Sequence, residues 1–275
     1  MSPSPSGPLP TGHALTGEVA ALLRRVAEKV VLPRYQSLAR HEIVEKSPGD
    51  VVTVADRESE AMLAEGLAKI MPDAAIVGEE AVHADPALAG RLGDALCWIV
   101  DPIDGTRNFA AGRPPFGLMI ALAERGETKA GWIYDPLQQR LCHASLGGGA
   151  WIGEDRVSAR TTGEDPPIAA ISMIFMDDRQ REHVRANLAP HYRLADIPYC
   201  AAEQYPRLAL GVNDVSIFER TLAWDHAAGV LWLNQAGGRC ARPDGSPYRV
   251  DEWDRKGMIA AASPALWEEL AARMA

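Results

Sequence analysis

Two aspartates at the end of an apolar run are the residues whose types and spacing most suggest chemistry. Residues 96–100 predict a short buried strand, and Asp101 and Asp104 follow it three residues apart. Burying unpaired carboxylates costs several kcal/mol for each anion, so a positive partner is required. The one basic residue of the stretch, Arg107, comes after both aspartates. Oxygen ligands in this arrangement suit Mg²⁺, Mn²⁺ or Ca²⁺ better than zinc or copper.

The two residues that follow, Gly105 and Thr106, predict an anion site. With Asp104 as the N-cap of a helix, the next amides point outward at the positive end of the helix dipole. A cation cluster beside such a turn is the arrangement that metal-assisted phosphoryl hydrolysis needs. The alternative is an ordinary turn, because Asp, Pro and Gly also dominate turns, and this stretch alone leaves both interpretations open.

Carboxylates also follow other predicted strands. Asp56 comes after the β-branched run 51–54, and Glu79 comes after the apolar run 74–77. Taken singly, the first is a helix N-cap and the second a solvated turn. Together with Asp101 they place a carboxylate at three strand ends, where ligands of α/β structures collect.

A late apolar helix adds a further acid. Asp225 begins this helix, and a Gly-Gly pair at 237–238 ends it. The neighbouring His226 is predicted to be a surface or hydrogen-bonded histidine, because no second histidine stands at metal-ligand spacing.

Composition narrows the function classes. The chain has 275 residues, 47% of them hydrophobic, and a formal net charge of −9, which together indicate a globular acidic protein. Nucleic-acid binding through a basic surface is disfavoured, whereas phosphate binding remains open if bound cations reverse the local sign. The scattered cysteines predict reduced, partly buried thiols in a cytoplasmic protein. Since no apolar run reaches the ~18 residues of a membrane helix, we expect no membrane partner.

The hydrophobic pattern predicts an alternation of helices and strands with one sheet meander. The predicted helices cover 14–39 (divided near Pro33), 56–70, 178–188, 201–210 and the segment from 225. The predicted strands cover 51–54, 74–77, 96–100, 117–123, 128–134, 140–144, 150–152, 168–175 and 215–218. Residues 1–12 are predicted to be a disordered Pro/Ser tail without the features of a signal peptide.

Three motifs together resemble the inositol monophosphatase family. They are Gly78-Glu79-Glu80, Asp101-Pro-Ile-Asp104-Gly-Thr106-x-Asn108-Phe109 and Trp224-Asp225-x-Ala-Ala-Gly. The resemblance runs from about residue 14 to the end of the chain. It implies an α/β (α+β) fold, the layered αβαβα sandwich shared with fructose-1,6-bisphosphatase. It further implies an α+β half over 13–155, an α/β half over 156–275 that contributes Asp225, and a homodimer.

The resemblance also implies a metal site. Glu79, Asp101 and the main-chain carbonyl of Ile103 would bind one Mg²⁺. Asp101, Asp104 and Asp225 would bind a second ion, and a third, weaker ion would lie near Glu79. The family's members are typically inhibited by lithium.

The roles implied for the remaining residues concern water and phosphate. Thr106, oriented by Asp56, would align a water activated near Glu79. The amides of Gly105 and Thr106 would hold the phosphate, and Glu80 and Lys46 would support the site.

The sequence departs from the family pattern at the substrate end. Tyr199-Cys200-Ala201 stands where the family commonly has Gly-Ser/Thr-Ala, and Glu219 precedes Asp225 by six positions instead of seven. The predicted substrate contacts are Asp104, Gly105, Thr106, Ala201, Glu219 and Asp225. A bulky Tyr199 would reshape the alcohol pocket.

The predicted function is therefore that of a Mg²⁺-dependent phosphomonoesterase. It would hydrolyse inositol monophosphate or a similar small polyol phosphate with a metal-activated water. Open alternatives are 3′-phosphoadenosine 5′-phosphate, histidinol phosphate and fructose 1,6-bisphosphate as substrates. From another class, a catalytically idle binding or regulatory protein would be expected to lack an acidic ligand, and here all are present. A dehydrogenase is disfavoured because the chain has no dinucleotide fingerprint.

Overall fold

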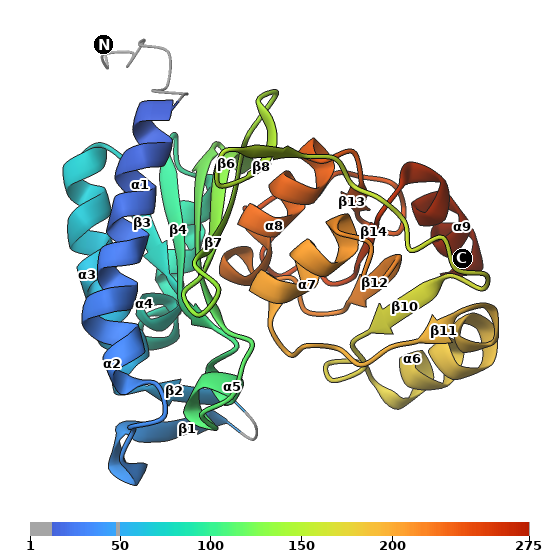
Figure 1. Cartoon of the computed structure of the whole chain (residues 1–275), viewed down its shortest axis with the longest axis horizontal. Coiled ribbons are helices and arrows are strands. Elements are labelled where there is room, and N and C mark those ends of the chain that lie inside the picture. Colours follow the sequence, from blue (N-terminus) through green and yellow to red (C-terminus); the bar gives the residue numbers. More distant parts are fainter. Residues whose placement is uncertain (1–12, 48–49, 275) are drawn as a thin grey trace.

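Alternating layers of helices and sheets make up the chain (Figure 1). The computed structural model describes residues 13–47 and 50–274. A helical layer with α1 and α3 covers one face of a large sheet, and α7 and α8 lie between that sheet and a smaller one. The α9 helix and the α6 segment cover the outer face of the smaller sheet. This is the predicted αβαβα sandwich.

The predicted helices occur in the predicted order, and α4 and α9 are helices that the sequence analysis did not predict. The bounds of the helices are α1 (His13–Val26), α2 (Leu32–Arg34), α3 (Val54–Ile70), α4 (Glu79–Ala84), α5 (Thr106–Ala110), α6 (Asp178–His183), α7 (Ala201–Ala209), α8 (Ala223–Gln235) and α9 (Pro264–Met274). Short 3₁₀ or π segments are Ala27–Val31, Arg40–Glu42, Pro86–Gly93, Val184–Leu188 and Ala189–His191. The first helix continues through a π segment into α2, which contains Pro33 in its first turn and ends at Arg34, so the chain beyond Arg34 is not helical as far as the predicted residue 39.

The large sheet contains the predicted meander. Its strands are β3 (Ala75–Gly78), β4 (Cys97–Asp104), β5 (Gly117–Glu124), β6 (Glu127–Asp135), β7 (Arg140–Ser145), β8 (Gly149–Ile152) and β9 (Asp155–Val157). They lie side by side in sequence order. Only β3 and β4 run parallel among these neighbours, and the other pairs are antiparallel. The parallel pair places the carboxyl ends of β3 and β4 at one edge, where Glu79 follows β3 and where Asp101 lies in the last part of β4.

The smaller sheet is built by the second part of the chain. Its strands are β10 (Ile168–Ile171), β11 (Arg193–Leu194), β12 (Val215–Phe218), β13 (Arg239–Ala241) and β14 (Met258–Ala261), and a separate hairpin comprises β1 (Ile43–Ser47) and β2 (Asp50–Thr53). The spatial order of the smaller sheet is β11-β10-β12-β14-β13. The division predicted at residues 155/156 falls within β9, the last strand of the large sheet, and it stays a prediction.

Three buried apolar clusters hold the layers together. The first lies between α1, α3 and the large sheet, and the second between the same sheet and α7 and α8. The third joins the smaller sheet to α9. The α8 helix is apolar on nearly all sides because it is enclosed by both sheets and α7. It therefore holds Asp225 rigidly against the large sheet.

The helix starts predicted at Asp56, Asp104 and Asp225 were wrong, whereas α6 starts at Asp178 as predicted. Thr53 caps α3, and Asp56 is the third residue of a capping box whose carboxylate returns to the Thr53 amide. Gly105 precedes α5, and Asp104 is the last residue of β4. Leu222 precedes α8, which places Asp225 within the first turn. Asp is common both at the cap and in the first turn, so sequence alone confuses these positions.

Two predicted strands have different lengths in the structure. The strand predicted over 96–100 extends to Asp104, so both aspartates belong to it. The strand predicted over 168–175 ends at Ile171, because the residues beyond it turn away to line a pocket. The predicted tail over 1–12 lies outside the described residues. Cys97, Cys142, Cys200 and Cys240 are free and buried, as predicted. No helix in the described ranges is long and apolar enough to cross a bilayer.

Candidate active site

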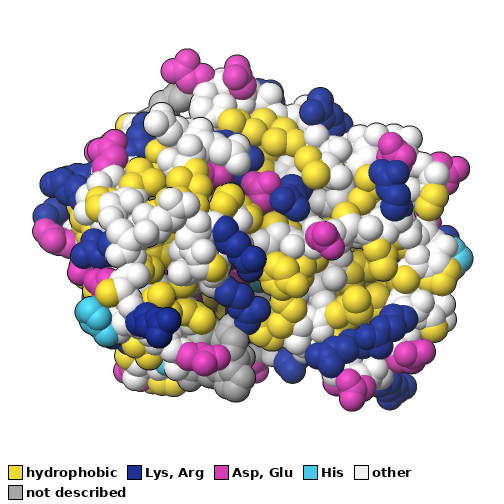
Figure 2. Space-filling model, turned by 60° about the horizontal axis from the view of Figure 1, so that its bottom comes forward, with side chains coloured by type: hydrophobic (Ala, Val, Ile, Leu, Met, Phe, Trp, Pro, Cys, Tyr) yellow, Lys and Arg dark blue, Asp and Glu magenta, His cyan; other side chains and the backbone are white. Residues whose placement is uncertain are grey.

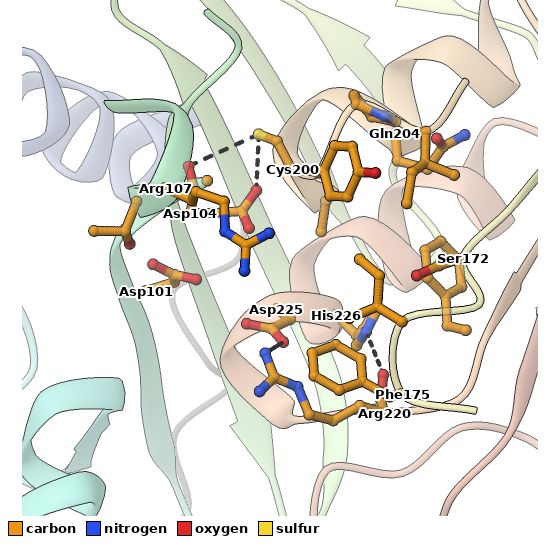
Figure 3. A pocket seen from close by; sticks show the side chains of 18 of the residues that line it. Asp101, Asp104, Arg107, Ser172, Phe175, Cys200, Gln204, Arg220, Asp225 and His226 are labelled. Carbon is orange, nitrogen blue, oxygen red and sulfur yellow. Dashed lines mark hydrogen bonds and ion pairs between the residues drawn. The ribbon is translucent and has the colours of Figure 1, made fainter. Parts of the chain in front are cut away.

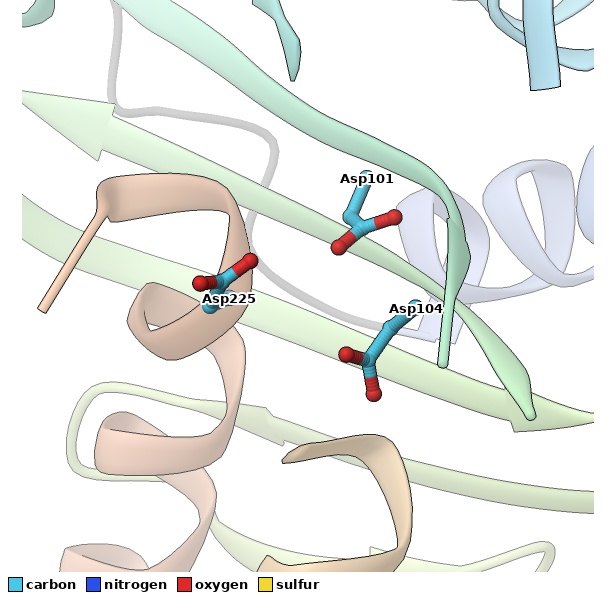
Figure 4. A group of neighbouring side chains, drawn as sticks. All are labelled: Asp101, Asp104 and Asp225. Carbon is cyan, nitrogen blue, oxygen red and sulfur yellow. The ribbon is translucent and has the colours of Figure 1, made fainter. Parts of the chain in front are cut away.

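Three carboxylates from distant parts of the chain meet at one point (Figure 4). Asp101, Asp104 and Asp225 each offer an oxygen atom, and these atoms lie within 4.8 Å of one another. The first two come from β4, where the pairing with β5 is irregular between them, and the third comes from α8. The irregular register lets two residues of one strand turn toward the same side.

Asp101 is the most deeply buried of the three. It is 1% exposed, and its Oδ1 has no hydrogen-bond partner in the part of the chain that the structure describes. Burial raises the pKa of this carboxyl well above its ordinary value, and the nearby Glu79, Asp104 and Asp225 raise it further. A buried acid surrounded by acids is stable in its charged form only with a cation. The all-oxygen donor set and the unpartnered Oδ1 fit a hard divalent ion such as Mg²⁺.

Asp104 is held by the start of α7. One of its oxygens, Oδ2, accepts a 2.6 Å hydrogen bond from the Ala202 amide and lies 3.0 Å from the Cys200 sulfur. Burial, with the charge of Asp225, raises the pKa of Asp104 to about 7. The Cys200 thiol thus donates to this carboxylate from the position where the family commonly has Ser or Thr.

Asp225 is paired with an arginine of the preceding loop. The Arg220 guanidinium lies 3.5 Å from Asp225 Oδ2 and 4.1 Å from the centre of the Phe175 ring (Figure 3). The next residue, His226, is buried and contacts the Tyr205 hydroxyl at 2.8 Å and the Arg220 carbonyl at 3.0 Å. It is therefore a hydrogen-bonded core histidine, as predicted, and burial lowers its pKa to about 3.

Glu79 lies on the same pocket, outside the cluster of three carboxylates. It is the first residue of α4, which is anchored by Glu60 through hydrogen bonds of 2.8 Å from the amides of Glu80 and Ala81. A Cβ at Gly78 would lie 2.3 Å from the Glu60 carboxyl carbon, so only glycine permits this close approach. The Gly-Glu-Glu motif thus positions Glu79 near Asp101, whose pKa it raises.

Thr106 is tied to the buried Asp56. The Thr106 hydroxyl lies 3.1 Å from Asp56 Oδ1 and 2.8 Å from the Ile103 carbonyl oxygen. The other oxygen of Asp56 accepts from the amide and the hydroxyl of Thr53 at 2.7 and 2.6 Å. Burial raises the pKa of Asp56 to about 7. The predicted pair of Thr106 and Asp56 is therefore in direct contact.

Gly105 makes the turn between the strand and α5. Its φ is +82°, and a Cβ there would lie 2.9 Å from the Pro115 carbonyl oxygen and 3.1 Å from Cys200 Cβ. Only glycine fits such a position. The following helix has only five residues, so the helix dipole expected from the sequence is small, and anion binding here depends on individual amides.

The acids open onto a pocket of about 280 Å³ between the two sheets. Each predicted substrate contact lines it: Asp104, Gly105, Thr106, Ala201, Glu219 and Asp225. Sequence reasoning missed Arg220, Glu60 and the thiol donor Cys200, because their roles arise from contacts between segments far apart in the chain. The side chain of Lys46, predicted to support the site, lies outside the described residues.

Comparison with known proteins places this geometry in a family. The sequence profile of the inositol monophosphatase family matches residues 15–275. The chain belongs to the inositol monophosphatase family. Inositol-1-monophosphatase of Bacillus subtilis is 31% identical over 233 residues, which cover 82% of this chain and 84% of that protein.

Other members of the inositol monophosphatase family carry a different name. Nus factor SuhB of Haemophilus influenzae is 32% identical over 260 residues, covering 92% of each chain. The crystal structure of the extragenic suppressor protein SuhB of Bartonella henselae superposes with a TM-score of 0.79 at 26% identity, covering 95% of this chain and 98% of that one. The fold of the family is therefore that of this chain.

Proposed function

We propose that this protein is a Mg²⁺-dependent phosphomonoesterase acting on small phosphate esters. The observation that carries the proposal is the convergence of Asp101, Asp104 and Asp225 on one point beside a pocket. Glu79 and the carbonyl of Ile103 complete the proposed ligands of two or three ions. Membership of the inositol monophosphatase family supports the reaction class.

The charges of the site explain why cations are needed. A phosphate monoester carries about two negative charges and would be repelled by the acids around Asp101. Divalent ions bound there would neutralise this repulsion, lower the pKa of a bound water and stabilise the leaving oxygen. The protein's own contribution is to hold the carboxylates in place, through β4, α8 and the contacts of Asp104.

Thr106 and Asp56 are proposed to orient the attacking water. The Thr106 hydroxyl has one proton and lies within hydrogen-bond reach of Asp56 Oδ1 and the Ile103 carbonyl, both of which accept it. Its oxygen lone pairs are then left to accept a hydrogen bond from the water, so the water's own lone pair is directed toward the phosphorus. The Gly105 and Thr106 amides are proposed to hold the phosphate oxygens.

Inositol monophosphate or a similar polyol phosphate is the proposed substrate. The pocket volume of about 280 Å³ suits a small ester, and Glu219 at its wall would accept hydrogen bonds from alcohol hydroxyls. Relatives named inositol-1-monophosphatase support this class. Bisphosphorylated nucleosides, histidinol phosphate and fructose 1,6-bisphosphate are the competing substrates. Homodimer formation and lithium inhibition are expected from the family.

A regulatory role without catalysis is the second candidate, because several relatives are named Nus factor SuhB. The complete acidic set favours catalysis.

Phosphate release measured across these esters, with Mg²⁺ and with a chelator, tests the proposal. We expect Asp101→Asn to reduce release at least about 100-fold, since even the loss of an outer-shell partner of a metal ligand costs 10–100-fold. The control is Asp178→Asn, at an exposed acid on α6, which should leave the rate unchanged. Hydrolysis that persists with the chelator, or in Asp101→Asn, would contradict the proposal.

A further inference from the structure

A group of exposed hydrophobic side chains lines the same pocket as the acids. Within the described residues, three of the large hydrophobic side chains that are exposed border this one pocket: Ile174, Phe175 and Tyr199, which are 43%, 48% and 52% exposed. On the face turned forward in Figure 2, hydrophobic side chains lie next to Lys and Arg side chains near the middle of the molecule. Exposed apolar groups gathered at a pocket indicate a ligand with an apolar face.

Tyr199 adopts a backbone conformation that bulky residues rarely have. Its φ is +54°, in the left-handed region, which costs a non-glycine residue about 1–3 kcal/mol. The side chain makes no hydrogen bond and no ring contact with any other part of the described chain, so neither kind of side-chain interaction offsets the strain. Glycine would fit this position without strain.

Hydrogen bonds link the residues on both sides of Tyr199 to the segment of the chain that contains Asp104 and Asn108. The Pro198 carbonyl accepts a 3.0 Å hydrogen bond from Asn108 Nδ2, and Cys200 and the Ala202 amide contact Asp104. These contacts fix the main chain of residue 199 and hold its ring at the pocket beside the proposed metal ligands.

Ile174 and Phe175 add further apolar surface to the pocket. Phe175 and Ile174 follow the end of β10, and the Arg220 guanidinium lies 4.1 Å over the Phe175 ring. A planar guanidinium on an aromatic ring extends a stacking surface and adds positive charge. A polyol would leave these apolar surfaces in contact with water.

We propose that Tyr199, together with Ile174 and Phe175, forms a subsite for a planar ring, so that a phosphate ester of an aromatic or nucleoside alcohol binds more tightly than one of a simple aliphatic alcohol. The inference rests on the proposed phosphatase function and specifies the alcohol side of the same pocket. Stacking of a ring on an aromatic side chain strengthens binding by about tenfold or more.

A matched pair of ligands that cannot be hydrolysed isolates the ring. Phenylphosphonate and methylphosphonate share the anion and differ in the ring, and calorimetric titration with Mg²⁺ present gives both affinities. We expect phenylphosphonate to bind the native protein about tenfold more tightly. The preference should fall below about twofold in Tyr199→Gly, persist in Tyr199→Phe and fall severalfold in Ile174→Ser.

Gln139→Gly is the control variant, because Gln139 has a φ of +52° and lies in an exposed turn away from the pocket. In each glycine variant, relief of the backbone strain stabilises the folded state, and the greater freedom of glycine in the unfolded chain destabilises it by a similar amount. Both variants should therefore melt within about 2 °C of the native protein. Only Tyr199→Gly should lose the ring preference.

Equal affinity for the two phosphonates, including no binding by either, would overturn the inference. So would a preference retained in Tyr199→Gly. Phosphate release from inositol 1-phosphate and adenosine 2′-monophosphate by the same preparation decides separately whether the phosphatase function stands.

Discussion

Asp101 shows how much of the site depends on the state of single side chains. Its carboxyl is buried, Glu79, Asp104 and Asp225 surround it with negative charge, and its pKa is raised well above the ordinary value. The sequence predicted this requirement for a cation from the spacing of Asp101 and Asp104 alone. The partners of the acids were not predictable, because Cys200 and Arg220 approach them only in the folded chain.

The raised pKa values predict how cation binding depends on pH. Asp104, with a pKa of about 7, and Asp101 favour the protonated form in the metal-free fold. The contribution of these two carboxyls to the stability of the metal-free fold is fully present when the pH is below their ordinary pKa of 3.8. It is lost as the pH rises through about 7, the pKa of Asp104 in the fold. A divalent ion must displace these protons, so its affinity should increase with pH.

Melting temperatures with and without Mg²⁺, measured from about pH 5.5 to about pH 8, test this effect. We expect the increase caused by Mg²⁺ to be small at the acidic end and to widen across this window. The exposed-site variant Asp178→Asn should behave like the native protein. A shift that is the same at every pH would show that these carboxyls do not exchange protons for the ion.

At the scale of elements, the predicted order was confirmed for the meander and for most helices, whereas the ends of the elements were less predictable. The helix starts predicted at Asp56, Asp104 and Asp225 differ from the observed ones by one to three residues. The cause is the same each time, because an aspartate can stabilise the free amides of a helix start both from the cap position and from the first turn. The early end of β10 at Ile171 is set by the pocket, which local sequence does not show.

The packing of α8 against α7 gives a second test at this scale. A Cβ at Gly229 would lie 2.0 Å from the Tyr205 ring, whose hydroxyl contacts His226. Gly229→Ala should therefore lower the free energy of unfolding by about 1–3 kcal/mol and weaken cation binding at the neighbouring Asp225.

Gly17→Ala is the matched helical control, because nothing lies within 4 Å of a Cβ at that exposed position of α1. It should raise the free energy of unfolding by about 0.5–1 kcal/mol. Chemical denaturation of both variants measures the effect. If Gly229→Ala left the free energy of unfolding unchanged, α7 and α8 could move apart with little loss of stability, and the prediction would be wrong.

At the scale of the whole molecule, the site exists only because the layers stack. The large sheet supplies Asp101 and Asp104, and the helix enclosed between both sheets supplies Asp225. The layered fold and the family were predicted from three motifs. The sequence showed Tyr199 only as a departure from the family pattern, since its exposure at the pocket and its backbone strain depend on segments that are not neighbours in the sequence.

The position of a bound ion tests the central claim most directly. Crystals grown with Mn²⁺ allow the ion to be located by its anomalous scattering. We expect a peak within about 2.0–2.3 Å of carboxylate oxygens of Asp101, Asp104 and Asp225, and its loss in Asp225→Asn. No peak among these residues in the native protein, or an unchanged peak in Asp225→Asn, would contradict the account.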